Sequence, residues 1–544
     1  MKKPVHMKNR TKKMASLLAL LLFMAGTATA WSAEEKPGET VVAASAGGST
    51  EPAPLLAAAS GAEADESAAG GEETLKESFN PFQYVVYKPL WEITNIIGDF
   101  NPIGKHIATP LEEAFPGLRV KGFINSITQL NTTGNSTSAG GARNKDWLLQ
   151  KQEFRTQLEL KYQYNDNLEF VNINNFSYDG AYDFQDTNGL YRDGSPNQVY
   201  YSQGKRIIKE AYVRGNYGTV NFTVGKQIVN WGKMDGKVID IVNAADGRDV
   251  VDSHIGDYEW RAIGQWMANV AVRPVENLTV NLLWNPDFQP NVGPAYGSPY
   301  WFPWVPSPAA GTPHIPNVTH SGFNHIDESE IGARVDTTIG GLSLSGIYYN
   351  GFDRDPVYYK TDGANHYDRL NKYGYALDYG TNIFDQRLII RSEGLYSAGR
   401  SFNTSDPNSV NGIVKKDQVK IALAFETSFF SDENKVDFLY QPIWTHNLDY
   451  DYLAQGARNE YLHVINLSHA VRATNDKLTL GATFYIGGGQ NNSGWAANYT
   501  AGWKFNDYLK GTLAYNDYQG QNDQIPWGVY NKWKNVTIDV KYEW

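Results

Sequence analysis

The order of the connections between alternating segments limits the possible folds most strongly. From Leu118 to Trp544 the chain reads as about 18 segments in which apolar and polar residues alternate with period two. Short turns and longer loops follow one another in strict alternation between these segments. In a soluble β-sandwich, short and long connections need not alternate. A membrane barrel has short turns at one rim and longer loops at the other, so its connections do alternate. We therefore predict an all-β, transmembrane, antiparallel up-and-down β-barrel over 118–544, with about 18 strands and a range of roughly 16–20.

The last segment supports this prediction. Val536, Ile538, Val540, Tyr542 and Trp544 alternate with polar residues, and the chain then stops. This pattern resembles the terminal strand of bacterial outer-membrane barrels, in which the apolar face meets lipid and the end aromatic lies at the membrane interface. We expect Tyr542 and Trp544 to serve as the assembly signal, with the barrel-assembly machinery and outer-membrane lipid as partners. The mean hydropathy of -0.46 does not oppose a barrel, because alternation averages the signal.

The region before the barrel has three parts. Residues 1–30 have a basic start, a short apolar run and an Ala28-Thr29-Ala30 site, which predict a secretory signal peptide and an outer-membrane location. Residues 31–74 are rich in Ala, Gly, Ser and Glu, which predicts a disordered periplasmic linker. Residues 75–117 contain aromatic residues and apolar positions at helical spacing, so we expect short helices that plug the barrel mouth or dock a periplasmic partner.

Composition excludes several classes of function. The chain has no cysteine, so it has no disulfide, thiolate metal site or c-type haem attachment. The net charge of -11, without a basic cluster, does not favour nucleic-acid binding. His314, His320 and His325 share one loop but lack regular ligand spacing, so we expect no metal site. The common hydrolase and nucleotide-binding motifs are absent from the sequence, so we expect neither an enzyme nor a cofactor.

One loop is unusual because it mixes apolar and charged residues. It begins Lys226-Gln227-Ile228-Val229-Asn230-Trp231, and folding into the lumen would cover its apolar side chains. Packing over the outer rim is the alternative. In the first case a constriction would form between the loop and inward-facing wall arginines. The residues that we assign to the pore or constriction are Lys226, Trp231, Lys233, Asp235, Lys237, Asp240, Arg155, Arg214, Arg261, Arg334 and Arg391.

The same loop resembles a known family. Its features are a Gly225-Lys226-Gln227 strand end, a Trp231-Gly232-Lys233-x-Asp235-Gly236 motif, and then Asp240 and Asn243. They are similar to those of an uncharacterised family of proteobacterial outer-membrane proteins, domain of unknown function 1302. Family members commonly have proline after the asparagine, where this chain has Ala244. Trp284-Asn285-Pro286 also looks like the family, which implies an outer-membrane barrel and no established substrate.

The next loop, 285–327, combines aromatic residues with prolines. We expect Tyr300, Trp301, Phe302 and Trp304 to form either a self-packed lid or a contact surface for apolar or sugar ligands.

Three functions fit these observations. A barrel of this size encloses an aqueous channel unless something plugs it, so the first is a porin-like channel that passes small solutes through a loop-constricted lumen. The first alternative is a barrel sheath of an electron conduit that holds a periplasmic multihaem cytochrome. The second is an uptake or export channel for apolar compounds. The sequence leaves the oligomeric state open.

Overall fold

The computed structural model describes most of the chain from residue 87 onward. The described ranges are 87–133, 147–183, 207–234, 238–247, 258–294, 300, 328–383, 386–430, 435–451, 454, 456–489, 492–520 and 527–544. The predicted signal peptide (1–30) and linker (31–74) lie outside them. Of the segment 75–117, the structure describes the part from residue 87.

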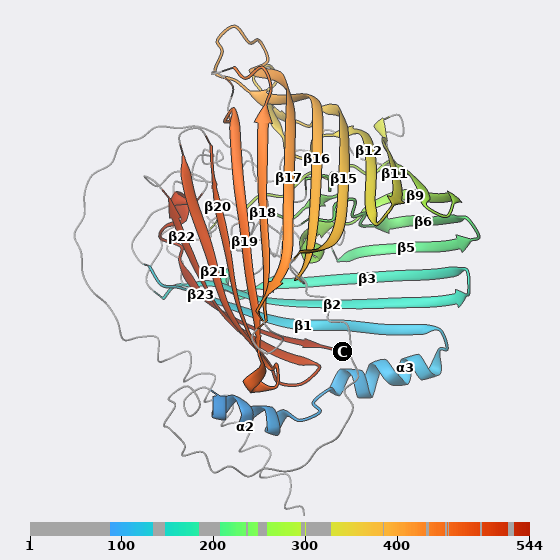
Figure 1. The fold of residues 1–544 in the computed structure, drawn as a ribbon, viewed down its shortest axis with the longest axis vertical. Helices are drawn as coiled ribbons and strands as arrows, with labels where there is room; N and C mark the ends of the chain where they lie inside the picture. Colours follow the sequence, from blue (N-terminus) through green and yellow to red (C-terminus); the bar gives the residue numbers. More distant parts are fainter. Residues whose placement is uncertain are drawn as a thin grey trace, which may run out of the picture. The chain divides into compact units, whose positions relative to one another are not determined.

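Eighteen strands within the described residues form one closed antiparallel sheet (Figure 1). Closure follows because β1 (Leu118–Asn131) pairs with β2 (Leu149–Asn165) on one side and with β23 (Asn535–Glu543) on the other. The predicted barrel and its strand count are confirmed. The remaining strands of this sheet are β3 (Leu168–Asp179), β5 (Ile208–Tyr217), β6 (Val220–Gln227), β9 (Gln265–Val275), β10 (Leu278–Asn285), β11 (Glu330–Ile339), β12 (Leu342–Phe352), β15 (Arg369–Ile383), β16 (Gln386–Asn403), β17 (Ile413–Phe429), β18 (Val436–Asn447), β19 (Asn459–Val471), β20 (Leu478–Gly488), β21 (Ser493–Lys504) and β22 (Leu509–Gly520).

The connections alternate between short and long, as the sequence predicts, except that the connection between β20 and β21 (489–492) is no longer than the turn between β21 and β22 (505–508). The turn between β11 and β12 consists of Gly340 and Gly341, whose φ angles of 55° and 85° suit glycine. Several connections hold short elements of their own: η4 (Gly180–Tyr182), β7 (Ala244–Ala245), α5 (Tyr258–Arg261), β8 (Ala262–Ile263), β13 (Val357–Tyr359), β14 (Ala364–His366), η8 (Arg472–Thr474) and η10 (Gly528–Tyr530). The two short pairs, β7–β8 and β13–β14, are antiparallel.

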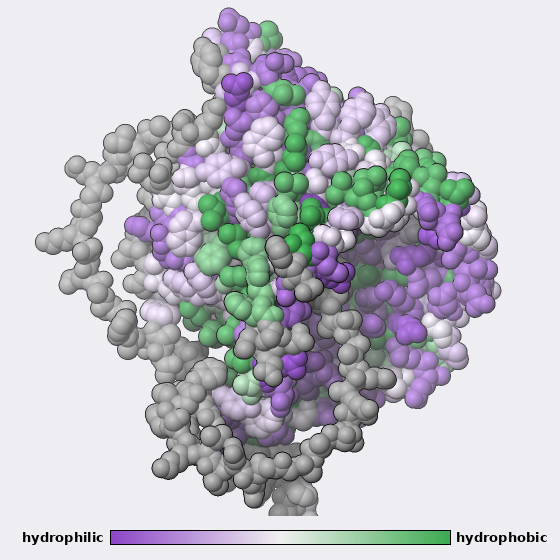
Figure 2. Space-filling view, viewed as in Figure 1, coloured by the Kyte–Doolittle hydropathy of each residue, from purple (hydrophilic) through white to green (hydrophobic). Residues whose placement is uncertain are grey.

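The two faces of the barrel wall differ in burial. In β1, Ile124 is 42% exposed, whereas Gln129 is fully buried. Successive side chains of a strand point to opposite faces. Residues paired across neighbouring strands share a face, so the register assigns a face to each residue of the other strands. Figure 2 shows hydrophobic side chains gathered over the strands on one side of the barrel. We call the face that contains Ile124 the outer face and the face that contains Gln129 the inner face.

Strand β3 departs from the regular alternation of apolar and polar residues. Its alternation is inverted in the middle. Asn172 and Asn174 lie on the same face as the exposed Phe170, while Val171 is buried on the inner face. The Asn174 amide donates to the Asn172 oxygen at 2.5 Å, and the Asn172 amide donates to the Glu210 carbonyl at 3.4 Å. Polar residues can therefore occupy the outer face without breaking the ladder.

The N-terminal helices belong to two compact units. In the first unit, α2 (Lys88–Ile97) has a proline in its first turn and ends at Gly98, whose φ is 50°. In the second unit, η3 (Gly104–Ala108) and α3 (Thr109–Ala114) follow one another directly before β1. None of the described helices is both long enough and apolar enough to cross a membrane.

Candidate functional site: a segment that crosses the lumen

The segment 228–247 follows β6 and makes contacts on opposite sides of the barrel. At its start, the Ile228 amide donates to the Glu210 carboxylate of β5 at 2.9 Å. A few residues later, the Lys233 amide donates to Glu393 of β16 at 2.6 Å. β5 and β16 are seven pairings apart in a ring of 18 strands, through β6, β9, β10, β11, β12 and β15. Residues 228–233 therefore cross the interior of the barrel. We call residues 228–247 the crossing segment.

The asparagine of the sequence motif closes this segment on itself. The Asn243 side chain accepts from the Val229 amide at 3.0 Å and donates to the Val229 carbonyl at 2.8 Å. This pairing ties residue 229 to residue 243 and forms the base of the segment. Asp240 lies beside this base, 3.4 Å from the Asn243 amide nitrogen. The spacing of the motif thus places the Asn243 side chain against the backbone of Val229.

An apolar core joins the crossing segment to the inner face. Trp231 is 3% exposed and meets Tyr349 of β12 edge-on, with ring centroids 6.0 Å apart. Opposite the indole is Gly332 of β11, where a methyl group would come within 2.5 Å of the Trp231 ring. Other apolar residues of the segment are buried in the same cluster: Val229, Met234, Val238, Ile239, Ile241 and Val242. Hydrophobic packing of this extent stabilises the segment inside the lumen.

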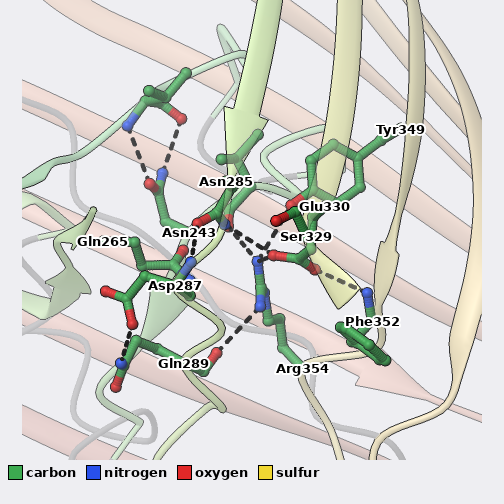
Figure 3. A network of polar contacts seen from close by, with 12 residues as sticks. Asn243, Gln265, Asn285, Asp287, Gln289, Ser329, Glu330, Tyr349, Phe352 and Arg354 are labelled. Atoms are coloured by element: carbon green, nitrogen blue, oxygen red, sulfur yellow. Dashed lines mark hydrogen bonds and ion pairs between the residues drawn. The ribbon is translucent and has the colours of Figure 1, made fainter. Parts of the chain in front are cut away.

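A buried ion pair holds the far end of the segment (Figure 3). Arg354 and Glu330 are 2.7 Å apart, with side chains 6% and 1% exposed. Arg354 also donates to the Val242 carbonyl at 2.7 Å, and Asn285 donates to Glu330 at 2.8 Å. A buried carboxylate needs such donors because removal from water is costly. Sequence reasoning missed this pair, since only the fold brings residues 242, 330 and 354 together.

The crossing segment and the wall line an open polar cavity of about 350 Å³. Arg334 lies at its wall, 2.7 Å from Asp336, and donates to the Trp231 carbonyl. Asn281 donates to Asp336 at 3.1 Å from the neighbouring strand. The cavity is lined by Tyr212, Arg214, Thr223, Gln227, Ile228, Val229, Asn230, Trp231, Asn269, Asn281, Arg334 and Asp336. Two of the wall arginines assigned from the sequence therefore reach one cavity.

Lys226 lies on the other side of the wall. In the register between β6 and β9 it pairs with Trp266, which is 42% exposed on the outer face. Its ammonium donates to the Ile208 carbonyl. The inner-face neighbour is Gln227, which is buried and pairs with Gln265. The prediction that Lys226 faces the lumen is therefore wrong. The strand register places this side chain on the outer face, and the mixed composition of this strand end did not reveal the register.

The other predicted charges form two further groups. Arg391 lies 3.6 Å from Asp378, and the Lys233 ammonium approaches the same carboxylate at 3.9 Å. Arg155 pairs with Glu153 at 2.9 Å and stacks on the Trp260 ring at 5.0 Å. Next to Trp260, Arg261 is buried and donates to the Asp246 carbonyl at 3.0 Å. Asp235 and Lys237 lie outside the described residues.

Of the four aromatic residues predicted to form a lid or contact surface, the structure describes Tyr300. Tyr300 is 2% exposed, and its hydroxyl accepts from Gln150 at 2.9 Å and from Asn535 at 3.5 Å. Both amides lie on the inner face, so this residue reaches into the barrel. Trp301, Phe302 and Trp304, with the three histidines of that loop, lie outside the described residues. Among the residues that the structure does describe, no group of three His, Asp or Glu side chains could hold a metal ion.

Comparison with known structures finds proteins of low sequence identity. OccK2 (OpdF) of Pseudomonas aeruginosa, solved in complex with glucuronate, is 9% identical with a TM-score of 0.46, over 79% of this chain and 98% of that one. OccAB3 of Acinetobacter baumannii is 8% identical with a TM-score of 0.48, over 78% and 99%. A BenF-like porin of Pseudomonas fluorescens Pf-5 is 9% identical with a TM-score of 0.46, over 79% and 99%. At these values the likeness supports no functional inference.

No curated protein matches this chain. The family model described as "Protein of unknown function (DUF1302)" matches residues 12–482, which is most of the sequence. This match confirms the resemblance carried by the motif around Trp231 and Asn243. The chain belongs to the DUF1302 family of proteins of unknown function.

Proposed function

We propose that this protein is a porin-like channel of the outer membrane, rather than an enzyme, and that small polar solutes pass through a lumen narrowed by residues 228–247. The proposal rests on one observation, which is that residues 228–233 cross the interior of the barrel. The segment contacts Glu210 on β5 and Glu393 on β16. It leaves a cavity of about 350 Å³ beside the wall. A space of this size suits a small solute.

The lining of the cavity supports polar rather than apolar solutes. The side chains of Arg334, Asp336 and Asn281 meet there, and amides and hydroxyls form much of the rest. The apolar residues of the segment pack into the buried core and leave little apolar surface for a ligand. Polar groups that line a passage replace part of the hydration that a solute loses on entry.

The occupied lumen also favours a channel over a cytochrome sheath. A sheath needs an interior free for a second protein. Here the interior holds residues of the chain itself, fixed by the Glu330–Arg354 ion pair and the Asn243–Val229 hydrogen bonds. To admit a cytochrome, the barrel would have to expel this core and expose its apolar side chains.

Cysteine modification tests the route, because the natural chain has no cysteine. Asn281→Cys places a thiol in the cavity, and Leu282→Cys places one on the outer face, where Leu282 is 54% exposed. A charged methanethiosulfonate reagent should reduce the single-channel current of Asn281→Cys and leave that of Leu282→Cys unchanged. Complete modification of Asn281→Cys, verified by mass, without any change in current would contradict the proposed route.

A further inference from the structure

The residues directly before the barrel form a helical segment with three distinct sides. η3 and α3 continue one another from Gly104 to Ala114. One side, with Gly104 and Ala108, is buried. A second side holds Ile107 and Leu111, which are four residues apart and share a helical face. The third side holds Lys105, Thr109 and Glu113, which are exposed. The segment therefore has a contact side, an apolar side and a polar side.

The contact side is fixed to the outer face of the terminal strands. The Tyr542 hydroxyl donates to Asn101 at 2.8 Å and accepts from the Ile103 amide at 3.0 Å. The Glu112 carboxylate accepts from the Val120 amide at 2.7 Å. Tyr542 pairs with Ile124, which is on the outer face. The segment thus lies outside the barrel rather than in its mouth, and we do not retain the plug expectation for residues 99–117.

The apolar side is exposed despite this close attachment. Ile107 is 52% exposed, Leu111 is 39% exposed and Phe115 is 57% exposed. Phe100 extends the stripe, and its ring also packs on Tyr542 with centroids 5.9 Å apart. Large apolar side chains gathered on one side of a helix mark an interaction surface.

The register places this stripe at the rim with the short turns. Leu118, the first residue of β1, pairs with Tyr162, close to the turn that joins β2 to β3. Short turns lie on the periplasmic side of outer-membrane barrels. The stripe is continuous with the apolar outer face, since Tyr542, which packs on Phe100, also contacts the Trp544 ring with centroids 5.8 Å apart, and that indole packs over Gly122 of β1.

We infer that residues 99–117 are an interfacial anchor whose apolar stripe is embedded in the phospholipid acyl chains of the periplasmic leaflet. This inference rests on the proposed outer-membrane location. An interfacial helix lies in the membrane plane with its apolar side toward the acyl chains and its charged side in water. Here the contact side is taken by the barrel, so Ile107, Leu111 and Phe115 face lipid while Lys105 and Glu113 face the periplasm.

Three single-cysteine variants of the full chain test the anchor: Leu111→Cys on the apolar stripe, Glu113→Cys on the polar side, and Leu513→Cys on the outer face of β22. Each carries a polarity-sensitive fluorophore and is reconstituted in phospholipid vesicles, after a heat-modifiable gel shift confirms folding. We expect acyl-chain spin-labelled lipid to quench the probes at residues 111 and 513 several-fold more strongly than the probe at 113. Aqueous iodide should show the reverse order.

Residue 513 is the control position, and it distinguishes failure of the anchor from failure of the proposed membrane location. Lipid quenching at residue 513 with iodide quenching at 111 would overturn the anchor and leave the barrel in the membrane. Iodide quenching at both positions would overturn the proposed membrane location together with the anchor. Protection of residue 111 from both quenchers would mean that protein covers the stripe, which also contradicts the anchor.

Discussion

Glu393 of β16 accepts a hydrogen bond from the backbone amide of Lys233 at 2.6 Å, across the lumen from the strand where the segment starts. The same carboxylate oxygen accepts from Met234 at 3.1 Å, and the side chain is 1% exposed. A carboxylate that accepts backbone amides forms strong, charge-assisted bonds. Glu393 is thus a positioning residue for Lys233 and Met234 of the crossing segment.

Removal of this carboxylate should loosen the segment. Glu393→Ala leaves two amides without their acceptor, at a cost of roughly 1–3 kcal/mol each. We expect a larger and noisier single-channel current from the variant. Glu426→Ala is the matched control, because it removes a lumen carboxylate that pairs with Arg391. Equal currents from both variants would show that loss of charge, rather than release of the segment, is responsible.

Gly332 should be sensitive to a single methyl group. A Cβ atom there would come within 2.5 Å of the Trp231 ring, so Gly332→Ala must displace the indole from its contact with Tyr349. At Gly346, on the paired strand, an added Cβ meets no atom within 4 Å. We expect Gly332→Ala to destabilise the barrel by about 1–3 kcal/mol and Gly346→Ala to have little effect. Urea unfolding in detergent compares the two.

The Glu330–Arg354 pair should behave as a coupled unit. Glu330→Leu leaves the Arg354 guanidinium buried without its partner, which typically costs about 3–5 kcal/mol. A double variant, Glu330→Leu with Arg354→Met, removes both charges and should recover part of this loss. A double-mutant cycle by urea unfolding measures the coupling. Additive effects of the two single variants would refute the coupling.

Asp353 gives a prediction about pH. Burial alone would raise its pKa, but the Arg400 guanidinium at 2.6 Å and the Lys372 ammonium outweigh burial and lower the pKa to about 2. Because the folded pKa is below the ordinary value of 3.8, the ionised group stabilises the fold above about pH 4. This stabilisation is lost as the pH falls toward 2. Asp353→Asn should therefore cost roughly 2 kcal/mol at pH 7, and the difference from wild type should vanish near pH 2.

The architecture was predictable because it depends on local pattern. Alternation and connection length are properties of neighbouring residues, so they gave the 18 strands and the rim with short turns. Polarity inversion at Asn172 weakened the signal for β3, since a residue whose side-chain oxygen accepts from Asn174 need not face water. The motif around Trp231 gave the family for the same reason: its residues lie close together in the sequence.

The interior was less predictable because it depends on which strands face one another. Glu393 and Lys233 are 160 residues apart, and Val242 meets Arg354 only through the barrel register. Lys226 shows the same dependence, since a shift of one position decides whether a side chain meets the lumen or the outer face. The position of residues 99–117 on the outer face likewise required the contacts of Tyr542.

The central claim is a solute path narrowed by the crossing segment, and single-channel recording in planar bilayers tests it most directly. The measurement compares the full-length protein with a variant in which residues 229–242 are replaced by a short glycine linker. Both must first show the heat-modifiable gel shift of a folded barrel. We predict a steady open current for the full-length protein and a several-fold larger current for the variant. Silence from both folded forms, or equal currents, would contradict the claim.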